Sequence, residues 1–160
     1  MSQQVVIGVD LGSAHCGWAV LTPAGARVDS GVWHHKRGRW EGGGVVFVAF
    51  ERFFSALITE HLSAGREVVV VFEEVRRHLG TDAAHMYGGL LATATAWCER
   101  QEPPVPYTSA GVGVIKKLAT GKGNASKAEM IAAAEARWGI QWENDDEADG
   151  LWAAMTWERS

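Results

Sequence analysis

The sequence has little cysteine and no long hydrophobic run. Cys16 and Cys98 are the only two cysteines in 160 residues, too few for a disulfide framework or a zinc-finger spacing. The longest apolar runs, 45–50 and 68–72, are too short to cross a bilayer. The first residues also lack the basic and apolar segments of a signal peptide. We therefore expect a cytoplasmic protein with two reduced thiols.

A strong excess of positive charge is also missing. The net charge is −4, which by itself argues against a nucleic-acid partner. Without four carboxylates that we assign to one site below, however, the remaining 15 acidic residues balance the 15 lysines and arginines. The positive charge is clustered, which is typical of a solvated surface but beside an acidic site also fits a bound polyanion. The clusters contain Lys36, Arg37 and Arg39; Arg76 and Arg77; and Lys116, Lys117 and Lys122.

Short apolar stretches between turn residues predict strands. A run apolar on both faces, 67–73, predicts a strand inside a sheet. The prolines within 103–106 lead into a short fifth strand, and 109–113 is predicted to be a loop. The first three strands follow one another with short turns, which indicates an antiparallel meander. They are predicted at 4–10, 15–21 and 27–33.

Apolar residues at helical spacing predict helices at 45–63 and 82–100, the second with Thr81 or Asp82 as its N-cap. Gly88 and Gly89 in its middle have two explanations, close approach of another helix across a dimer or packing within one chain. Further helices are expected at 114–119, from a Ser126/Glu129 capping box to Trp138, and from Asn144 onwards, where Asn144 and Glu147 form a second cap pair.

Four carboxylates stand at the edges of these predicted elements. Asp10 and Glu73 end buried strands, whereas Asp146 and Asp149 lie three residues apart on one face of the last helix. Such hard oxygen ligands favour Mg²⁺ or Mn²⁺. Two such ions held by shared carboxylates can support phosphodiester hydrolysis. Lys127, in the first turn of the helix that follows the capping box, is placed to contact a phosphate.

These motifs, in this order, resemble the RuvC-type Holliday junction resolvases of the RNase H-like superfamily. The resemblance rests on Gly-Val-Asp10-Leu-Gly-Ser, on the strand end at Glu73 and Glu74, on the glycine- and lysine-rich tract before Lys127, and on Asp146-Glu-Ala-Asp149-Gly-Leu. The lysine tract is most similar to RuvC-like proteins of bacteriophages. The motifs span almost the whole chain.

The resemblance implies an α/β, RNase H-like fold over residues 1–160, with a five-stranded mixed sheet flanked by helices. It implies a homodimer through helix 82–100, in the cytoplasm of a bacterium or a phage-infected host, that nicks two strands of a four-way DNA junction. By matching, the metal-binding catalytic residues are Asp10, Glu73, Asp146 and Asp149, and the catalytic lysine is Lys127. Glu73 is preferred to Glu74, and Asp146 to Asp145, by position and spacing.

The chain departs from the family after its strand-end glutamate, where cellular members place an aromatic residue and this chain has Arg76 and Arg77. Relaxed substrate choice, including Y-forks, is therefore expected. Trp33 and Trp40 flank a basic loop without a family counterpart, and both base stacking and simple packing stay open for them. The alternative functions are a non-catalytic junction-binding module and a RuvC-like RNA-processing nuclease. A sugar-kinase or Hsp70-like ATPase needs a second lobe that 160 residues do not supply.

Overall fold

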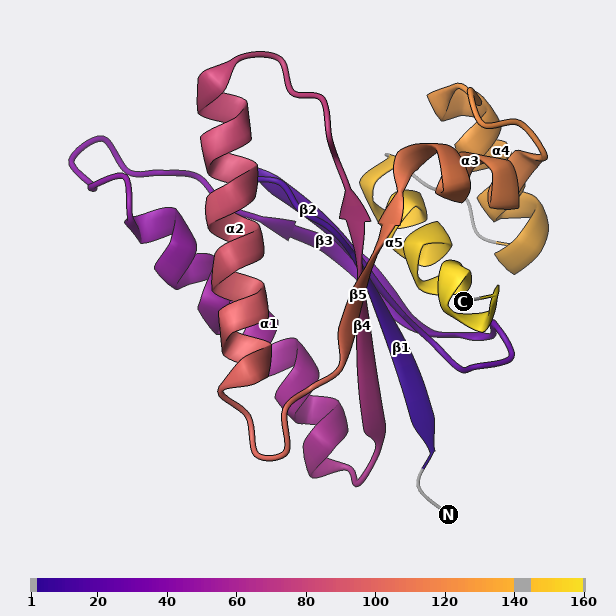
Figure 1. The fold of residues 1–160 in the computed structure, drawn as a ribbon, viewed down its shortest axis with the longest axis horizontal. Helices are drawn as coiled ribbons and strands as arrows, with labels where there is room; N and C mark the ends of the chain where they lie inside the picture. Colours follow the sequence, from indigo (N-terminus) through magenta and orange to yellow (C-terminus); the bar gives the residue numbers. More distant parts are fainter. Residues whose placement is uncertain (1–2, 140–144, 160) are drawn as a thin grey trace.

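A computed structural model of the chain describes residues 3–139 and 145–159. Its five strands are β1 (Gln4–Asp10), β2 (His15–Leu21), β3 (Arg27–His34), β4 (Glu67–Glu74) and β5 (Tyr107–Gly111). They form one sheet in the order β3-β2-β1-β4-β5 (Figure 1). The first three strands pair antiparallel, as the predicted meander requires, and β4 pairs parallel with both β1 and β5. The sheet is therefore mixed, and β4 lies inside it as expected.

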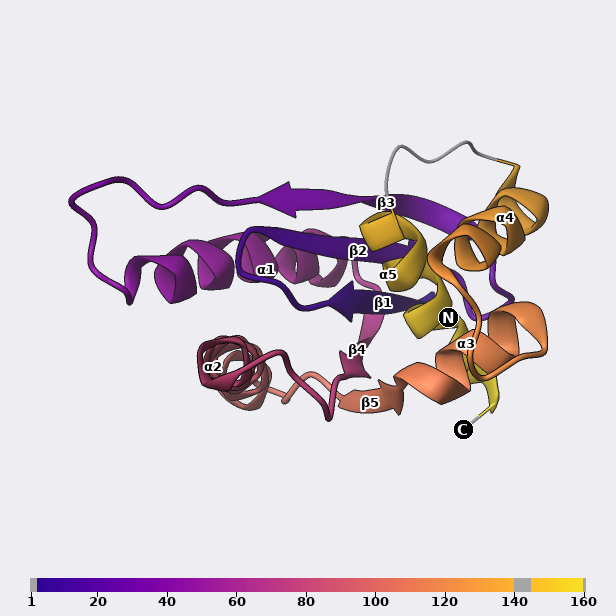
Figure 2. The same ribbon diagram turned by 90° about the horizontal axis from the view of Figure 1, so that it is seen from above.

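Helices cover both faces of this sheet. They are α1 (Val45–Ser63), α2 (Thr81–Glu99), α3 (Val112–Thr120), α4 (Lys127–Trp138) and α5 (Asp145–Met155), followed by the short 3-10 helix η1 (Thr156–Arg159). In both ribbon views α1 and α2 lie on one side, and α3, α4 and α5 lie on the other (Figures 1 and 2). Within the described residues, no helix is both long and apolar enough to cross a bilayer.

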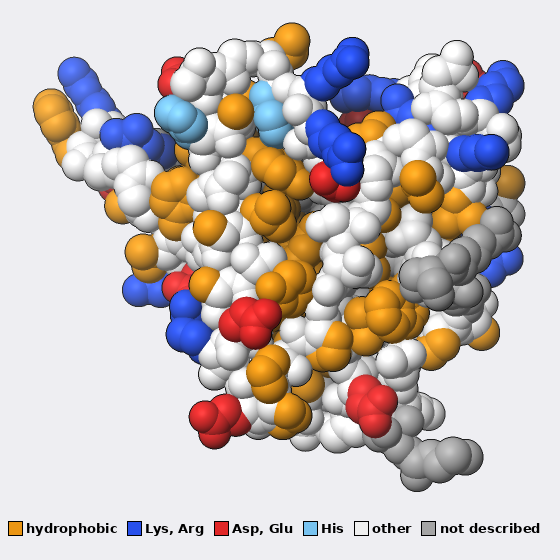
Figure 3. Space-filling model, viewed as in Figure 1, with side chains coloured by type: hydrophobic (Ala, Val, Ile, Leu, Met, Phe, Trp, Pro, Cys, Tyr) orange, Lys and Arg blue, Asp and Glu red, His pale blue; other side chains and the backbone are white. Residues whose placement is uncertain are grey.

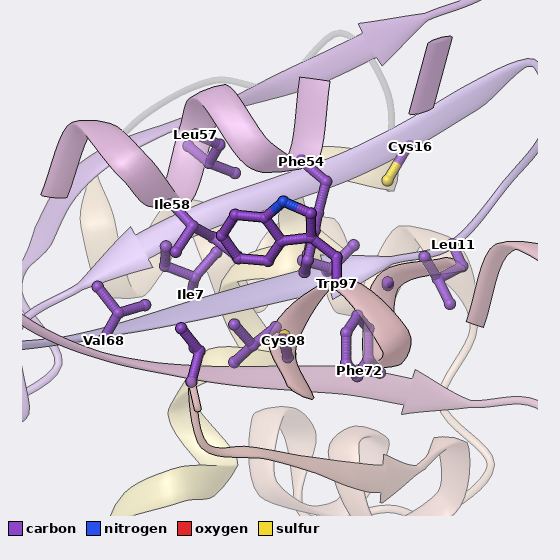
Figure 4. Packing of buried hydrophobic residues seen from close by; sticks show 14 of the residues in the cluster. Ile7, Leu11, Cys16, Phe54, Leu57, Ile58, Val68, Phe72, Trp97 and Cys98 are labelled. Atoms are coloured by element: carbon purple, nitrogen blue, oxygen red, sulfur yellow. The ribbon is translucent and has the colours of Figure 1, made fainter. Parts of the chain in front are cut away.

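The two layers of helices enclose two hydrophobic cores because the side chains of β1 alternate between the faces of the sheet. Val5, Ile7 and Val9 pack with α1 and α2, whereas Val6 packs with the helices of the other layer. The first core is rich in aromatic rings. Phe54 lies centrally in it, 6.0 Å from Phe72 of β4 and 5.5 Å from Trp97 of α2, measured between ring centroids (Figure 4).

The predicted loop at 109–113 is wrong. Ser109, Ala110 and Gly111 continue β5, where they pair with Phe72, Glu73 and Glu74 of β4, and α3 begins immediately afterwards at Val112. The segment lacks the apolar alternation that marks a strand in sequence, and its backbone is held instead by pairing with β4. Residues 109–111 therefore lengthen β5, so that it runs alongside the end of β4 that carries Glu73.

The predicted cap of α2 is also wrong. The N-cap is Gly80, whose φ of 96° favours glycine, and neither Thr81 nor Asp82 is the N-cap because both already lie within the helix. The capping box of α4 is confirmed, with the Ser126 hydroxyl accepting from the Glu129 backbone N–H and the Glu129 carboxylate accepting from the Ser126 N–H. The predicted cap pair of Asn144 with Glu147 is not tested, because Asn144 lies outside the described residues.

The two glycines of α2 have different surroundings. A Cβ on Gly89 would lie 2.4 Å from a ring carbon of Phe47 on α1, so packing within the chain requires this glycine. A Cβ on Gly88 would meet nothing within 4 Å, and Gly88 is exposed. Packing within one chain therefore explains Gly89 but leaves Gly88 on the outer face of the helix.

Candidate active site

Three carboxylates from three elements meet at one edge of the sheet. Asp10 ends β1, and Glu73 stands beside it near the end of β4, because the two parallel strands are in register with Val9 opposite Phe72. Asp149 reaches the same place from the second turn of α5. One oxygen from each of the three carboxylates lies within 4.8 Å of the other two, and all three side chains are partly buried.

Glycines let α5 approach the sheet closely enough to deliver Asp149. A Cβ on Gly17 of β2 would lie 1.7 Å from the carbonyl oxygen of Asp146, and one on Gly8 of β1 would lie 2.0 Å from that of Gly150. A Cβ on Gly150 would in turn lie 2.9 Å from the Cα of Trp18. The helix backbone thus rests directly on β1 and β2, and a side chain at any of these positions would push it away.

Polar contacts also fix the first turn of α5 to β3, the edge strand of the sheet next to β2. The Ser30 hydroxyl of β3 donates a hydrogen bond to the Glu147 carboxylate, and the Nε of Arg27 donates to the Ser30 hydroxyl at 2.6 Å. The Arg27 guanidinium also lies 4.0 Å from Glu147. Glu147 therefore anchors the start of the helix, which leaves Asp149 to face the ends of β1 and β4.

Burial and neighbouring carboxylates hold the pKa values of all three groups above their ordinary values. Burial, followed by the charge of Glu73, raises the pKa of Asp10 well above its ordinary value. Burial also raises the pKa of Glu73, although a hydrogen bond with Asp10 and then the positive charge of Lys116 partly oppose this effect. For Asp149, burial and then the charge of Glu73 raise the pKa to about 8. A cation at this point would relieve the repulsion and allow all three groups to ionise.

The donor set fits a hard divalent cation. It consists of carboxylate oxygens, and among residues 3–139 and 145–159 no other group of acidic, histidine or cysteine side chains has such spacing. Hard oxygen donors are the ligands that Mg²⁺ and Mn²⁺ prefer. The geometry of Asp10, Glu73 and Asp149 is therefore that of a candidate metal centre.

The architecture matches that of solved Holliday junction resolvases. RuvC of Thermus thermophilus, in complex with Holliday junction substrate, superposes with a TM-score of 0.79 at 21% identity, covering 96% of this chain and 92% of that protein. The chain has the RuvC fold. The predicted RNase H-like class, a five-stranded mixed sheet flanked by helices, is confirmed.

Two further resolvases share the RuvC fold more distantly. The yeast mitochondrial Holliday junction resolvase Ydc2 has a TM-score of 0.58 at 18% identity, covering 99% of this chain and 79% of Ydc2. Fowlpox virus resolvase, in complex with substrate Holliday junction DNA, has a TM-score of 0.56 at 8% identity, with 98% and 97% covered. No protein-family profile and no curated protein matches the chain in sequence, so the likeness is one of fold.

Asp146 lies near the group formed by Asp10, Glu73 and Asp149 but is not one of its members. Its Oδ2 is 3.9 Å from Nδ1 of His15, the first residue of β2. Asp145, which we did not select from the sequence, lines a cavity of about 180 Å³ together with Glu73 and Asp149. Asp145 precedes Asp149 by four residues, a spacing that also places two side chains on one helix face and could have indicated it.

Two lysines line the same cavity. The Nζ of Lys127, the first residue of α4, lies 3.0 Å from Oδ2 of Asp145, and this contact raises the pKa of Lys127. Lys116 of α3 is close enough to Glu73 for its positive charge to oppose part of the rise in the pKa of that carboxyl. The sequence indicated Lys127 for this place, whereas it indicated Lys116 only as one member of a basic cluster.

The other basic residues predicted from the sequence lie outside the cavity that Lys116 and Lys127 line. Arg76 and Arg77 follow β4 and line an open groove with Gly111 and Val114, and Arg76 pairs with Glu74 at 3.0 Å. Lys117 lines a different cavity, with β5 and η1, and Lys122 pairs with Glu129 at 3.2 Å. Lys36, Arg37 and Arg39 lie in the loop between β3 and α1. Lys and Arg side chains gather along this upper edge of the molecule (Figure 3).

Proposed function

We propose that this protein is a metal-dependent endodeoxyribonuclease that resolves Holliday junctions, and other branched DNA such as Y-forks, by paired nicking of the phosphodiester backbone. The observation that carries the proposal is the group formed by Asp10, Glu73 and Asp149 at the ends of β1 and β4 in a RuvC fold. Two of the solved proteins with this fold are complexes with Holliday junctions. The proposed role belongs to DNA recombination and repair, as in phage RuvC-like proteins.

We assign the metal-binding role to Asp10, Glu73, Asp149 and Asp146, with Mg²⁺ or Mn²⁺ as the ion and two ions in each active site. The mutual repulsion of the first three carboxylates supports a requirement for cations. When bound, such ions supply Lewis-acid activation of water and stabilise the charge on the phosphate and on the leaving oxygen. The reaction adds water across one P–O bond, so that the phosphate keeps the hydroxyl and the leaving deoxyribose oxygen takes a proton.

The protein's own cations hold the phosphate over the carboxylates. Lys127 is the proposed catalytic lysine, because its Nζ reaches the cavity that Glu73 and Asp149 line. It is 84% exposed, which leaves its ammonium group accessible to a phosphate oxygen. Such a fixed positive charge stabilises the negative charge that develops on the transferring phosphoryl group. Asp145 holds the ammonium group in place when no DNA is bound.

The proposed DNA-binding surface extends from this site along the upper edge of the molecule. Each lysine or arginine that contacts a phosphate releases counterions, so that affinity falls steeply with salt. The Lys and Arg side chains that gather along this edge support this surface (Figure 3). The proposed DNA contacts are Arg76, Arg77, Lys116, Lys117, Lys122, Lys36, Arg37 and Arg39.

Paired nicking requires two active sites, and we propose a homodimer through α2. Gly88, Ala92 and Ala96 are exposed on the outer face of this helix, at spacings that place them along one stripe. Small residues allow two helices to approach closely, and a Cβ on Gly88 would lie more than 4 Å from the rest of the described chain outside the helix's own backbone. We place this dimer in the cytoplasm of a bacterium or a phage-infected host, and we treat residues 1–160 as a single nuclease domain.

Cleavage of a labelled immobile four-way junction, with Mg²⁺ or Mn²⁺, tests this function beside linear duplex, Y-fork and RNA–DNA hybrid. Mutating a residue that only orients a metal ligand typically lowers metal affinity or activity by about 10- to 100-fold. We therefore expect Asp10→Asn and Asp149→Asn, which replace the proposed ligands themselves, to lower the cleavage rate by at least about 100-fold. Glu60→Gln is the matched control, because Glu60 is an exposed acid near the end of α1, at the opposite edge of the sheet.

The outcomes separate the alternatives. Symmetric nicks in the junction that both variants lose support a resolvase, and equal cleavage of Y-forks broadens it to a debranching nuclease. Binding of the junction without cleavage under any metal condition would instead favour a non-catalytic binding module. Preferential cleavage of RNA would favour an RNA-processing nuclease.

A further inference from the structure

The loop between β3 and α1 exposes a tryptophan at its tip. The side chain of Trp40 is 88% exposed, whereas every other tryptophan whose surroundings the structure describes is at least partly buried. Trp138, for example, donates its Nε1–H to the carbonyl of Gly25 at 3.0 Å. Leaving a large aromatic ring in water is unfavourable, and tryptophan is enriched at binding interfaces. Packing within the chain, one of the two explanations left open by the sequence, does not account for Trp40.

The tip is an ordered turn that projects this ring. The Gly38 backbone N–H donates to the Glu41 carboxylate at 2.7 Å, and the Glu41 N–H donates to the Gly38 carbonyl at 3.2 Å. Arg37 closes the turn from outside by donating its Nε–H to the Glu41 carbonyl at 2.8 Å. Arg39 and Trp40 therefore occupy the two central positions of the turn. Residues 36–41 contain three cations, Lys36, Arg37 and Arg39, against the single carboxylate of Glu41, so the tip keeps a net positive charge.

Trp40 already carries a stacking partner. The guanidinium carbon of Arg39 lies 5.0 Å from the centroid of the Trp40 ring, within the range of a cation–π contact. This contact restrains the ring and still leaves most of its surface accessible. A restrained aromatic ring with an arginine beside it is suited to stacking on a nucleobase, because every base has a π-face.

The root of the loop is tied to the candidate active site. The His35 N–H donates to the carbonyl of Ala14 at 2.9 Å, and Ala14 lies in the turn that follows Asp10. Trp33, at the end of β3, stacks on Phe53 of α1 with 5.4 Å between ring centroids, which fixes the direction in which the loop leaves the sheet. The loop thus protrudes from the same edge as the carboxylates, at the upper left of the molecule, with basic and hydrophobic side chains (Figure 3).

We propose that Trp40, with Arg39 beside it, stacks on an unpaired nucleotide of the DNA substrate while Lys36 and Arg37 contact the adjacent phosphates. This inference rests on the proposed function, since it assumes a branched DNA substrate at the same edge. Bases inside a duplex have no free face, whereas branch points and fork arms offer unpaired nucleotides. The tip therefore selects branched over linear DNA by a contact outside the cleavage site.

Binding is measured by fluorescence anisotropy in the Asp10→Asn background, which removes cleavage. The probes are a labelled four-way junction with two unpaired nucleotides at the branch and a fully paired linear duplex of the same strand. Stacking on one base is worth about 1–3 kcal/mol, so Trp40→Ala is expected to weaken junction binding by about 5- to 150-fold. Duplex binding should change by less than about 2-fold, and Trp40→Phe should restore most of the lost affinity.

Two further readouts separate stacking from a general effect. Trp40→Ala removes no charge, so the slope of log Kd against log salt is expected to stay constant, whereas Arg37→Ala should reduce it by about 1. Wild-type protein should also change the fluorescence of 2-aminopurine placed at the unpaired position, and the Trp40→Ala variant should not. Val28→Ala is the matched control, because Val28 is an exposed apolar residue, 41% exposed, at the opposite end of β3.

The result that overturns the inference differs from the result that overturns the function. If wild type cleaves junctions but Trp40→Ala binds both probes as wild type does, or loses affinity for both equally, the stacking role is wrong and the nuclease stands. If wild type neither cleaves branched DNA nor binds it in preference to duplex, the proposed function fails, and the inference fails with it.

Discussion

Replacing Asp149 with asparagine should stabilise the metal-free protein. In the wild type, Asp149 lies close to Asp10 and Glu73, and burial, followed by the negative charges of Glu73, Asp145 and Asp146, raises its pKa from 3.8 to about 8. Folding without a cation therefore either keeps a proton on this group or confines several negative charges together. Asparagine has nearly the same shape and no charge, so the repulsion disappears while the packing of α5 is kept.

The sign and size of the effect follow from linkage. The folded state holds the Asp149 proton more tightly than the unfolded state does. The stability that this tighter proton binding adds is therefore complete below about pH 4 and is lost as the pH rises through about 8. Each pH unit in this window is worth about 1.4 kcal/mol, which sets a ceiling of about 6 kcal/mol. Water entering the open edge of the sheet reduces this ceiling, and we expect about 2–4 kcal/mol above pH 8.

Thermal unfolding followed by tryptophan fluorescence, in EDTA and from pH 5 to pH 9, measures this effect. For a chain of 160 residues, a gain of about 2–4 kcal/mol corresponds to a Tm increase of roughly 4–16 °C for Asp149→Asn at pH 9. The increase should shrink towards pH 5. Adding Mg²⁺ or Mn²⁺ should raise the Tm of wild type and have little effect on the variant. Equal Tm values for wild type and variant at every pH in EDTA would refute the reasoning, and Glu60→Gln controls for the general effect of removing a negative charge.

Three further substitutions test how the site is built. Gly17→Ala places a Cβ 1.7 Å from the Asp146 carbonyl oxygen, so we expect a loss of about 3 kcal/mol or more in urea unfolding and weaker metal binding by calorimetry; an unchanged stability would contradict the close approach of α5. Ser126→Ala removes the N-cap of α4 and should lower the free energy of unfolding by about 1 kcal/mol, which denaturant titration measures. Lys127→Ala should reduce junction cleavage by about 100-fold while junction binding stays within about 3-fold. Arg52→Ala, which removes an exposed cation of α1 outside the cavity and outside the proposed DNA contacts, should leave the cleavage rate nearly unchanged.

Much of the fold was predictable because the local signals are strong. The strands β1 and β2 have the bounds that their apolar runs indicate, and α1 has those of its helical spacing. The capping box at Ser126 fixed the start of α4, and the helix ends at Trp138 as expected, followed by Gly139 with a φ of 71°. Each of these features depends on residues that are close together in sequence, and such features can be recognised without knowing the tertiary structure.

Features that depend on contacts between distant residues were not predictable in the same way. The strand at Ser109–Gly111 exists because β4 pairs with it, and Ser-Ala-Gly alone favours a loop. Similarly, Gly8 and Gly17 look like ordinary strand residues in the sequence, and only the position of α5 shows that each must lack a side chain. Gly89 has the same kind of explanation in the ring of Phe47.

The choice between Asp145 and Asp146 shows why the site itself is harder to predict than the fold. Residues three and four positions before Asp149 both share its face of a helix, so spacing alone cannot distinguish them. The distinction comes from what packs on either side of α5: Lys127 of α4 lies 3.0 Å from Asp145, and His15 of β2 lies 3.9 Å from Asp146. Both neighbours are brought there by other elements. The first turn of α5 thus presents Asp145 towards Lys127 and Asp146 towards His15 at the start of β2, and no sequence spacing reveals which of the two has which neighbour.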